Sequence, residues 1–138
     1  MSETPPAATR PTPESAPPRA ADGGEDQIQL DIRTEGPDQV VVTAAGEVDM
    51  LTSPRLRATV LEQLQGGAEL VVLDLDGVTF LGTSGLAVLI ELREAAHAVG
   101  TEFRLACTAR RVLRPLTIAG LMPLFDIHET LAAALAET

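Results

Sequence analysis

"LVVLDLDGVTFLGTSGLAVLIEL", residues 70–92, passes directly from a strand pattern to a helix pattern. Its first six residues are almost continuously apolar, which is typical of a central strand covered on both faces. After the strand, apolar residues recur at helical spacing until Gly100, so we expect a helix from about Ser84 to Val99. This strand, tight loop and helix predict an α/β fold.

Upstream of this stretch, the sequence predicts a hairpin and a helix. Residues 27–34 alternate apolar and polar side chains, and residues 40–48 form a second strand pattern after a short turn, so the two strands should pair antiparallel. Residues 51–67 predict a helix with Ser53 as its N-cap, Pro54 in its first turn and two glycines at its end.

Downstream, the sequence predicts a strand at 101–108, a helix at 109–120, an edge strand at 124–129 and a final helix. Pro115 lies inside the first of these helices, which should therefore be short or bent. The expected order, β-β-α-β-α-β-α-β-α, describes one domain over residues 27–138: a mixed sheet with an N-terminal hairpin and about four helices. Residues 1–26 hold six of the ten prolines and predict a disordered, acidic tail rich in Pro and Ala.

The composition of the chain argues against several classes of function. A net charge of −10 argues against binding to nucleic acid phosphates or to an anionic membrane. The single cysteine, Cys107, is expected to be a small core residue, and His97 and His128 are too far apart in sequence to predict a metal site. The N-terminus lacks the apolar stretch of a signal peptide and no apolar run reaches membrane-span length, so we expect a cytoplasmic protein.

The loop before the central helix holds two hydroxyls, Thr83 and Ser84, between Gly82 and Gly85. A role as helix cap explains either hydroxyl by itself. A serine nucleophile would need a base and an orienting acid, and a phosphate-cradling P-loop would need a lysine, which the chain lacks. The other open reading is a phosphoryl acceptor, because free N–H groups and the helix dipole favour negative charge at a helix N-terminus.

The helix after this loop carries a wider apolar face than a core needs. The residues expected to face the sheet are Val88, Leu92, Ala95 and Val99. Leu86 and Ile90 are then partly left over, and they either pack against a neighbouring helix or line a partner surface. Met50 and Leu51 present the same choice between an interface and loop packing.

Three stretches together resemble the STAS domain, especially that of the bacterial anti-sigma factor antagonists. Residues 70–92 resemble its central strand, loop and helix, and "GEVD", residues 46–49, is similar to the stretch before the family's first helix. "RRVLRPLTIAGLMPLFDIHETLAAAL", residues 110–135, resembles its last third. The likeness spans about residues 27–137 and implies a STAS-like fold.

The resemblance implies a protein partner switch that is no enzyme and needs no cofactor of its own. Antagonists of this family bind an anti-sigma factor that is also an ATP-dependent serine kinase of the GHKL type, which frees the sigma factor and so regulates transcription indirectly. The kinase phosphorylates the loop hydroxyl and releases the antagonist, and a PPM-type serine phosphatase resets it. The family's modified hydroxyl directly precedes the loop glycine, which implies Ser84 here, with Thr83 as second choice.

The same resemblance implies the residues that contact the partner. They are Glu47, Asp49, Gly82, Thr83, Gly85, Leu86 and Ile90. The family's loop usually begins with Asp, whereas this chain has Gly82, and we hypothesise that Asp49 or Glu47 supplies negative charge from the preceding loop. The alternative function, which Gly82 fits somewhat better, is a STAS module that serves a transporter as an accessory subunit or senses a ligand, anion or nucleotide without phosphorylation.

Overall fold

The central strand of the sheet is the one that begins the stretch quoted above. The computed structural model describes residues 27–136, so the tail expected over residues 1–26 lies outside the described residues. β4 (Leu70–Leu81) lies third in the order β2-β3-β4-β5-β6. Its first four residues are all buried, because both faces of the sheet are covered there.

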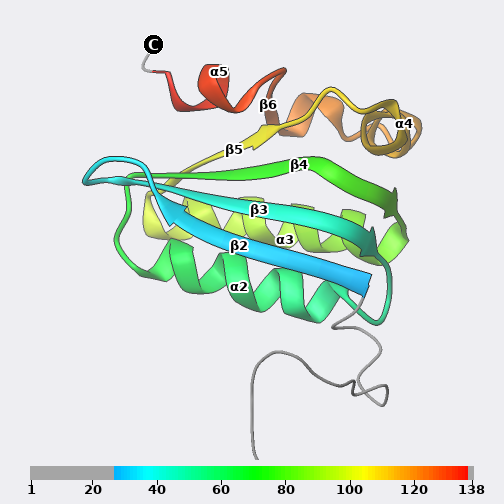
Figure 1. Ribbon diagram of the computed structural model, residues 1–138, viewed down its shortest axis with the longest axis horizontal. Coiled ribbons are helices and arrows are strands. Elements are labelled where there is room, and N and C mark those ends of the chain that lie inside the picture. The colour runs from blue at the N-terminus through cyan, green and yellow to red at the C-terminus, as the bar shows by residue number, and fades with distance from the viewer. Residues whose placement is uncertain (1–26, 137–138) are drawn as a thin grey trace, which may run out of the picture.

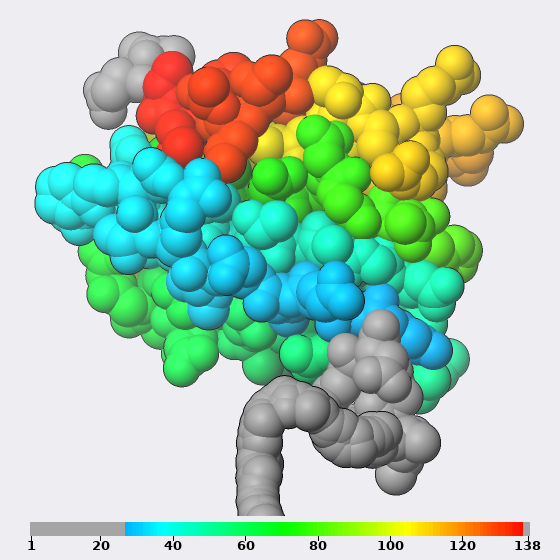
Figure 2. Space-filling model, in the orientation of Figure 1, coloured from blue at the N-terminus to red at the C-terminus, as the bar shows by residue number. Residues whose placement is uncertain are grey.

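The other strands build outward from β4. β2 (Ile28–Thr34) and β3 (Gln39–Val48) form the expected antiparallel hairpin, and β3 pairs with β4 in parallel. β5 (Glu102–Ala106) and β6 (Asp126–His128) continue the sheet in parallel on the other side. The sheet is therefore mixed, with β2 and β6 as its edges, and the blue atoms of β2 lie on the molecular surface in Figure 2.

Helices cover the sheet on both faces. α2 (Ser53–Gln65) and α3 (Thr83–Val99) lie side by side on one face (Figure 1), where Leu56, Val60 and Leu92 join the main core. α5 (Leu131–Leu135) covers the other face through Ala134, which packs with buried residues of β3, β4 and β5. α4 (Arg110–Ile118) and the 3-10 turn η2 (Met122–Leu124) complete the chain.

α4 occupies the place that β5 leaves free beside the second half of β4. β5 pairs only with Leu70–Asp74, and beyond that point the Asp76 carboxylate accepts from the N–H groups of Thr108 and Ala109 at the start of α4. Arg111 donates to the carbonyl oxygen of Val78 at 2.7 Å. These hydrogen bonds fix the position of the second half of β4 up to the loop that follows it.

The predicted element order is confirmed, with two local corrections. Thr52, not Ser53, is the N-cap of α2, and Pro54 lies in the first turn as expected. Val99 was expected to face the sheet but is exposed at the end of α3, where Gly100 ends the helix with φ 75°. Within residues 27–136, no helix combines the length and apolar character that crossing a bilayer requires.

Candidate functional site

The loops that follow β3 and β4 emerge side by side at one end of the sheet. Val48 and Leu81 are paired in the sheet, and the N–H of Gly82 donates to the carbonyl oxygen of Val48 at 2.9 Å. α2 begins five residues after Val48 and α3 two residues after Leu81. Two helix N-termini and both loops therefore share the edge at the right of Figure 1.

Asp49 shapes the first of these loops. One of its carboxylate oxygens accepts from the N–H of Leu51 at 2.9 Å and from the N–H of Thr52 at 3.0 Å. The Thr52 hydroxyl donates to the carbonyl oxygen of Glu47 at 2.7 Å and closes the turn. A short acidic side chain that bonds the N–H two residues later is the usual way to start such a turn. Asp49 therefore holds the entry to α2, and it is half-buried next to the second loop.

The hydroxyls of the second loop do not cap α3. The N-cap is Gly82, Thr83 and Ser84 are the first two helical residues, and no side chain caps this helix. Within residues 27–136, neither hydroxyl takes part in a hydrogen bond. The reading of Thr83 or Ser84 as a cap is therefore wrong, because a cap must lie one residue earlier, where its side chain can reach the free N–H groups.

The backbone at the start of α3 keeps unused donors. The first bond of the helix runs from the N–H of Leu86 to the carbonyl oxygen of Gly82 at 3.1 Å. The N–H groups of Thr83, Ser84 and Gly85 have no acceptor among the described residues. Thr83 is exposed and Ser84 is half-buried, so both side chains reach the surface beside three free donors.

Gly85 is required by packing. A Cβ on this residue would lie 2.5 Å from Cδ1 of Leu81 and 2.7 Å from Cγ1 of Val48. Gly85 is also buried, and its missing side chain lets α3 approach the ends of β3 and β4, so its expected contact with a partner stays a prediction. Gly82 differs, because its φ of −90° suits any residue and a Cβ there would meet mainly the Phe80 ring at 3.0 Å.

Three large apolar side chains surround this edge, and we call them the apolar trio. Met50 is 77% exposed, Leu51 is 68% exposed and Phe80 is 53% exposed. Packing among residues 27–136 therefore leaves the side chains of Met50 and Leu51 uncovered, and their role at an interface stays a prediction. Phe80 stands opposite Glu47 in the sheet, so the acidic Glu47 flanks its exposed ring.

Phe80 was not singled out from the sequence, because strand alternation places it with Val78 in the core. β4 has extra residues relative to β3: Val78 pairs with Gly46, but Phe80 pairs with Glu47. This bulge leaves Thr79 unpaired and turns Phe80 outward. Beside the bulge, Gly46 of β3 has a φ of 105°, and a Cβ there would meet the Gln27 carbonyl oxygen at 2.1 Å.

The remaining predicted contact residues lie farther along α3. Leu86 is half-buried and packs partly against the core, and Ile90 is half-buried one turn further on. α2 covers part of α3, and an ion pair joins Arg57 to Glu91 at 2.6 Å. Glu47, Asp49, Gly82, Thr83 and Ser84 thus gather at one edge, whereas Ile90 lies about 9 Å along the helix from Ser84.

In the described part of the chain, no histidine lies near Ser84. His97 lies in the last turn of α3, and His128 lies in β6, two strands away from β4. Neither imidazole can therefore activate the Ser84 hydroxyl as a nucleophile. Within residues 27–136, no group of His, Cys, Asp and Glu side chains is placed to hold a metal ion.

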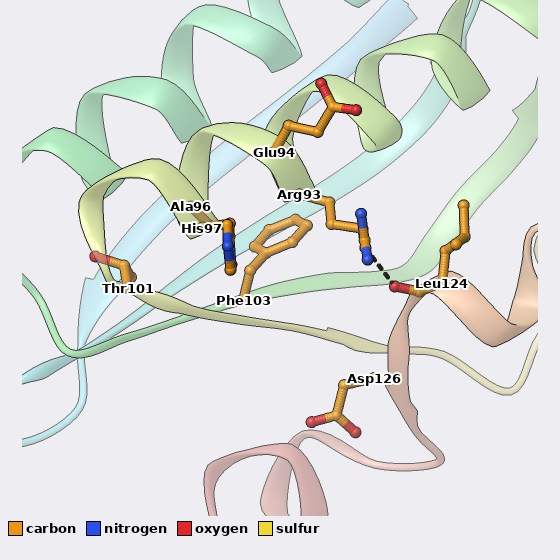
Figure 3. A pocket seen from close by; sticks show the side chains of 8 residues that line it. All are labelled: Arg93, Glu94, Ala96, His97, Thr101, Phe103, Leu124 and Asp126. Carbon is orange, nitrogen blue, oxygen red and sulfur yellow. Dashed lines mark hydrogen bonds between the residues drawn. The ribbon is translucent and has the colours of Figure 1, made fainter.

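A cavity beside α3 lies in another part of the molecule. It measures about 430 Å³ and lies between the second half of α3, β5 and the η2 segment (Figure 3). The Arg93 side chain, which lines it, donates to the carbonyl oxygen of Leu124 at 2.8 Å (Figure 3). None of its lining residues belongs to the two loops.

Cys107 is buried at the end of β5, as expected of a core residue. Desolvation raises the pKa of its thiol to about 11, so the reactive thiolate is scarce at neutral pH.

Comparisons with known proteins identify the family and the fold. A family model described as the STAS domain matches residues 30–134. The anti-sigma-F factor antagonist RsfB of Mycobacterium tuberculosis is 30% identical over 112 residues, covering 72% of this chain and 89% of that protein. The anti-sigma-B factor antagonist of Bacillus subtilis is 27% identical over 100 residues, covering 72% and 90%. A crystal structure of an anti-sigma factor antagonist from Mycobacterium paratuberculosis superposes with a TM-score of 0.74 at 30% identity, covering 80% of this chain and 93% of that one.

Proposed function

The chain belongs to the STAS domain family, and from this premise we propose that it is an anti-sigma factor antagonist switched off by phosphorylation of Ser84. In its unmodified state it binds an anti-sigma factor of the GHKL serine-kinase type and thereby frees a sigma factor. The single observation that carries the proposal is the start of α3, where the Ser84 hydroxyl reaches the surface without capping the helix. A hydroxyl with no structural bond at that place is available for modification.

The start of α3 can accept a phosphoryl group without unfolding. Three N–H groups, those of Thr83, Ser84 and Gly85, lack acceptors there, and the positive end of the helix dipole favours an anion. In the transfer, Oγ of Ser84 forms a bond to the γ-phosphorus of ATP while the bond from that phosphorus to the bridging oxygen breaks. ADP leaves, and the hydroxyl proton passes to a base of the kinase.

The modification changes the surface that the partner meets. A phosphoserine carries a charge of about −1.5 to −2 at neutral pH. It would stand at the edge of the apolar trio, next to Glu47 and Asp49. Burying that charge against an apolar partner surface costs solvation energy. The carboxylates of Glu47 and Asp49 also repel the phosphate, which raises the cost of removing it from water. Phosphorylation therefore lowers affinity while the fold stays intact.

The residues at this edge of the sheet indicate what kind of surface the partner presents. The apolar trio needs an apolar counterpart on the partner, against which an added phosphate would lose its hydration. Gly82 replaces the acid that usually begins the family's loop, and Asp49 supplies a carboxylate from the adjoining turn. A PPM-type phosphatase would then restore the unmodified state.

A binding comparison tests this proposal. The purified chain is titrated with kinase-type anti-sigma factors from the same genome, and its affinity is compared with that of Ser84→Asp. Thr117→Asp is the matched control, because Thr117 is an exposed hydroxyl residue on α4, away from the two loops. We expect Ser84→Asp to lose binding at least tenfold and Thr117→Asp to keep it. Equal affinity of Ser84→Asp and the unmodified chain would favour the accessory or sensor role without phosphorylation.

A further inference from the structure

The outer edge of β2 has no strand beside it in the described part of the chain. β2 is the first strand of the sheet and pairs only with β3 among residues 27–136. In Figure 2 its blue atoms form a strip across the face toward the viewer. An open edge presents unpaired N–H and C=O groups that can pair with another strand.

The hairpin fixes which backbone groups point to the open edge. The N–H of Glu35 donates to the carbonyl oxygen of Gln39 at 2.8 Å, and bonded pairs alternate along an antiparallel ladder. Asp31 and Arg33 therefore direct their backbone groups to β3, whereas Leu30, Ile32 and Thr34 direct theirs outward.

The open segment is bounded at its start. The outward carbonyl oxygen of Ile28 accepts from Nη1 of Arg55 at 3.2 Å, so this position is already used. The segment that remains open is Leu30–Thr34, and its middle residue is Ile32.

The side chains of this segment are self-complementary. Ile32 is 44% exposed, which the core of one chain does not explain. Asp31 and Arg33 stand on either side of it, both exposed, on the opposite face of the strand, where Arg33 also forms an ion pair with Glu35 of its own chain. An acid and a base at equal distances from a central residue face each other when the segment pairs with itself antiparallel.

We propose that a second copy of this chain occupies the β2 edge, with the two β2 strands antiparallel about a two-fold axis through Ile32. In this register Ile32 faces the partner's Ile32, and Leu30 faces the partner's Thr34, so all the outward backbone groups of the segment are paired. Asp31 faces the partner's Arg33, and this pairing occurs twice. The two sheets become one continuous sheet across the axis.

The charges select this register against its neighbours. An axis through Asp31 would place Asp31 against its own copy, and an axis through Arg33 would do the same for Arg33. Like charges directly opposite each other in a sheet are destabilising, whereas opposite charges stabilise by about 0.2–1 kcal/mol a pair. An axis through Thr34 would pair Arg33 with the partner's Glu35, but it would carry Leu30 and Ile32 past the end of the partner's β2. An axis through Leu30 would need the Ile28 carbonyl oxygen, which accepts from Arg55, so the register through Ile32 pairs the most outward groups.

Charge reversal tests the proposal. Sedimentation equilibrium on the full chain should show a monomer–dimer equilibrium, and Asp31→Arg or Arg33→Asp alone should weaken it about tenfold. The double variant Asp31→Arg/Arg33→Asp should restore the affinity to within about twofold, because it exchanges the two charges. Glu129→Arg, an equal change of charge at an exposed residue after β6, is the control and should leave the equilibrium unchanged.

A second variant acts on the backbone. Ile32→Pro removes one outward N–H that β3 does not use, so circular dichroism should show a folded chain that stays monomeric. A chain that is monomeric up to about 1 mM would overturn the proposal. So would a dimer that tolerates the single charge reversals, or a double variant no better than the single ones. The Ser84 loop lies at the strand ends, so these results are independent of the proposed switch.

Discussion

The N–H of Gly82 and the carbonyl oxygen of Val48 are joined by a hydrogen bond of 2.9 Å, which ties the loop before α3 to the end of β3. Through this bond the Asp49 turn, the apolar trio and the Ser84 hydroxyl belong to one small surface. Its framework is rigid, because β3 and β4 lie in the sheet and α2 and α3 pack on each other. A negative charge on this surface changes what can bind while the framework stays in place.

Gly85→Ala should destabilise the fold. The new methyl group meets Leu81 and Val48 at less than 3 Å, so we expect a loss of about 1–3 kcal/mol in the free energy of unfolding. The chain has no Trp or Tyr, so urea unfolding is followed by far-UV circular dichroism. Gly82→Ala is the control: its φ suits Ala and the exposed Phe80 ring can move, so we expect a change within about 0.5 kcal/mol. Equal losses in both variants would contradict the packing role of Gly85.

Asp49→Asn removes the negative charge of the side chain and keeps its shape. The amide keeps an oxygen that can accept from the N–H groups of Leu51 and Thr52, so stability should change little. Asp49→Ala removes that acceptor and should cost about 1 kcal/mol, as loss of a cap does. If the carboxylate charge serves the partner, both variants lose affinity in a titration. Affinity that is unchanged in Asp49→Asn would assign Asp49 to the turn alone.

Phe80→Ser should affect binding far more than folding. The ring is exposed at a bulge, so the free energy of unfolding should change by no more than about 0.5 kcal/mol. Aromatic residues at the centre of an interface carry much of its energy, and we expect at least a tenfold loss of affinity for the anti-sigma factor. Ile118→Ser, at an exposed apolar residue of α4, is the matched control and should bind normally. Equal effects of the two variants would show that the apolar trio is not the docking surface.

Cys107 should make the fold sensitive to alkaline pH. Its thiol has a pKa of about 11 in the folded chain against about 9 when exposed, so the folded state holds this proton more tightly. The resulting stability is complete below about pH 9 and is lost as the pH rises through about 11. The chain has no Lys or Tyr to titrate in the same range. Urea unfolding at several pH values should show a steeper decline for the natural chain than for Cys107→Ala, and parallel declines would contradict this assignment.

The sequence predicted the sheet because its signals are local and strong. The apolar run of β4 and the alternation of β2 set the strands, and glycines mark the ends of α2 and α3. The family resemblance pointed to the loop at Ser84, which the structure places at the start of α3.

Details that depend on one residue of register escaped prediction. A shift of one position made Gly82 the N-cap of α3, and a bulge turned Phe80 out of the core. Arg104 is buried in β5 and donates to the carbonyl oxygens of Ala134 and Ala136, which holds the end of the chain. No local pattern marks this residue, because its acceptors lie about 30 residues further along the chain.

Phosphate mapping tests the central claim most directly. The chain is incubated with the kinase-type anti-sigma factor and ATP, and mass spectrometry locates the phosphate, with Ser84→Ala and Thr83→Ala measured in parallel. We expect one phosphate, on Ser84, which Ser84→Ala abolishes and Thr83→Ala retains, together with release of the modified chain from its partner. A stable complex that never gains phosphate on the Ser84 loop, or release without any modification there, would contradict the switch.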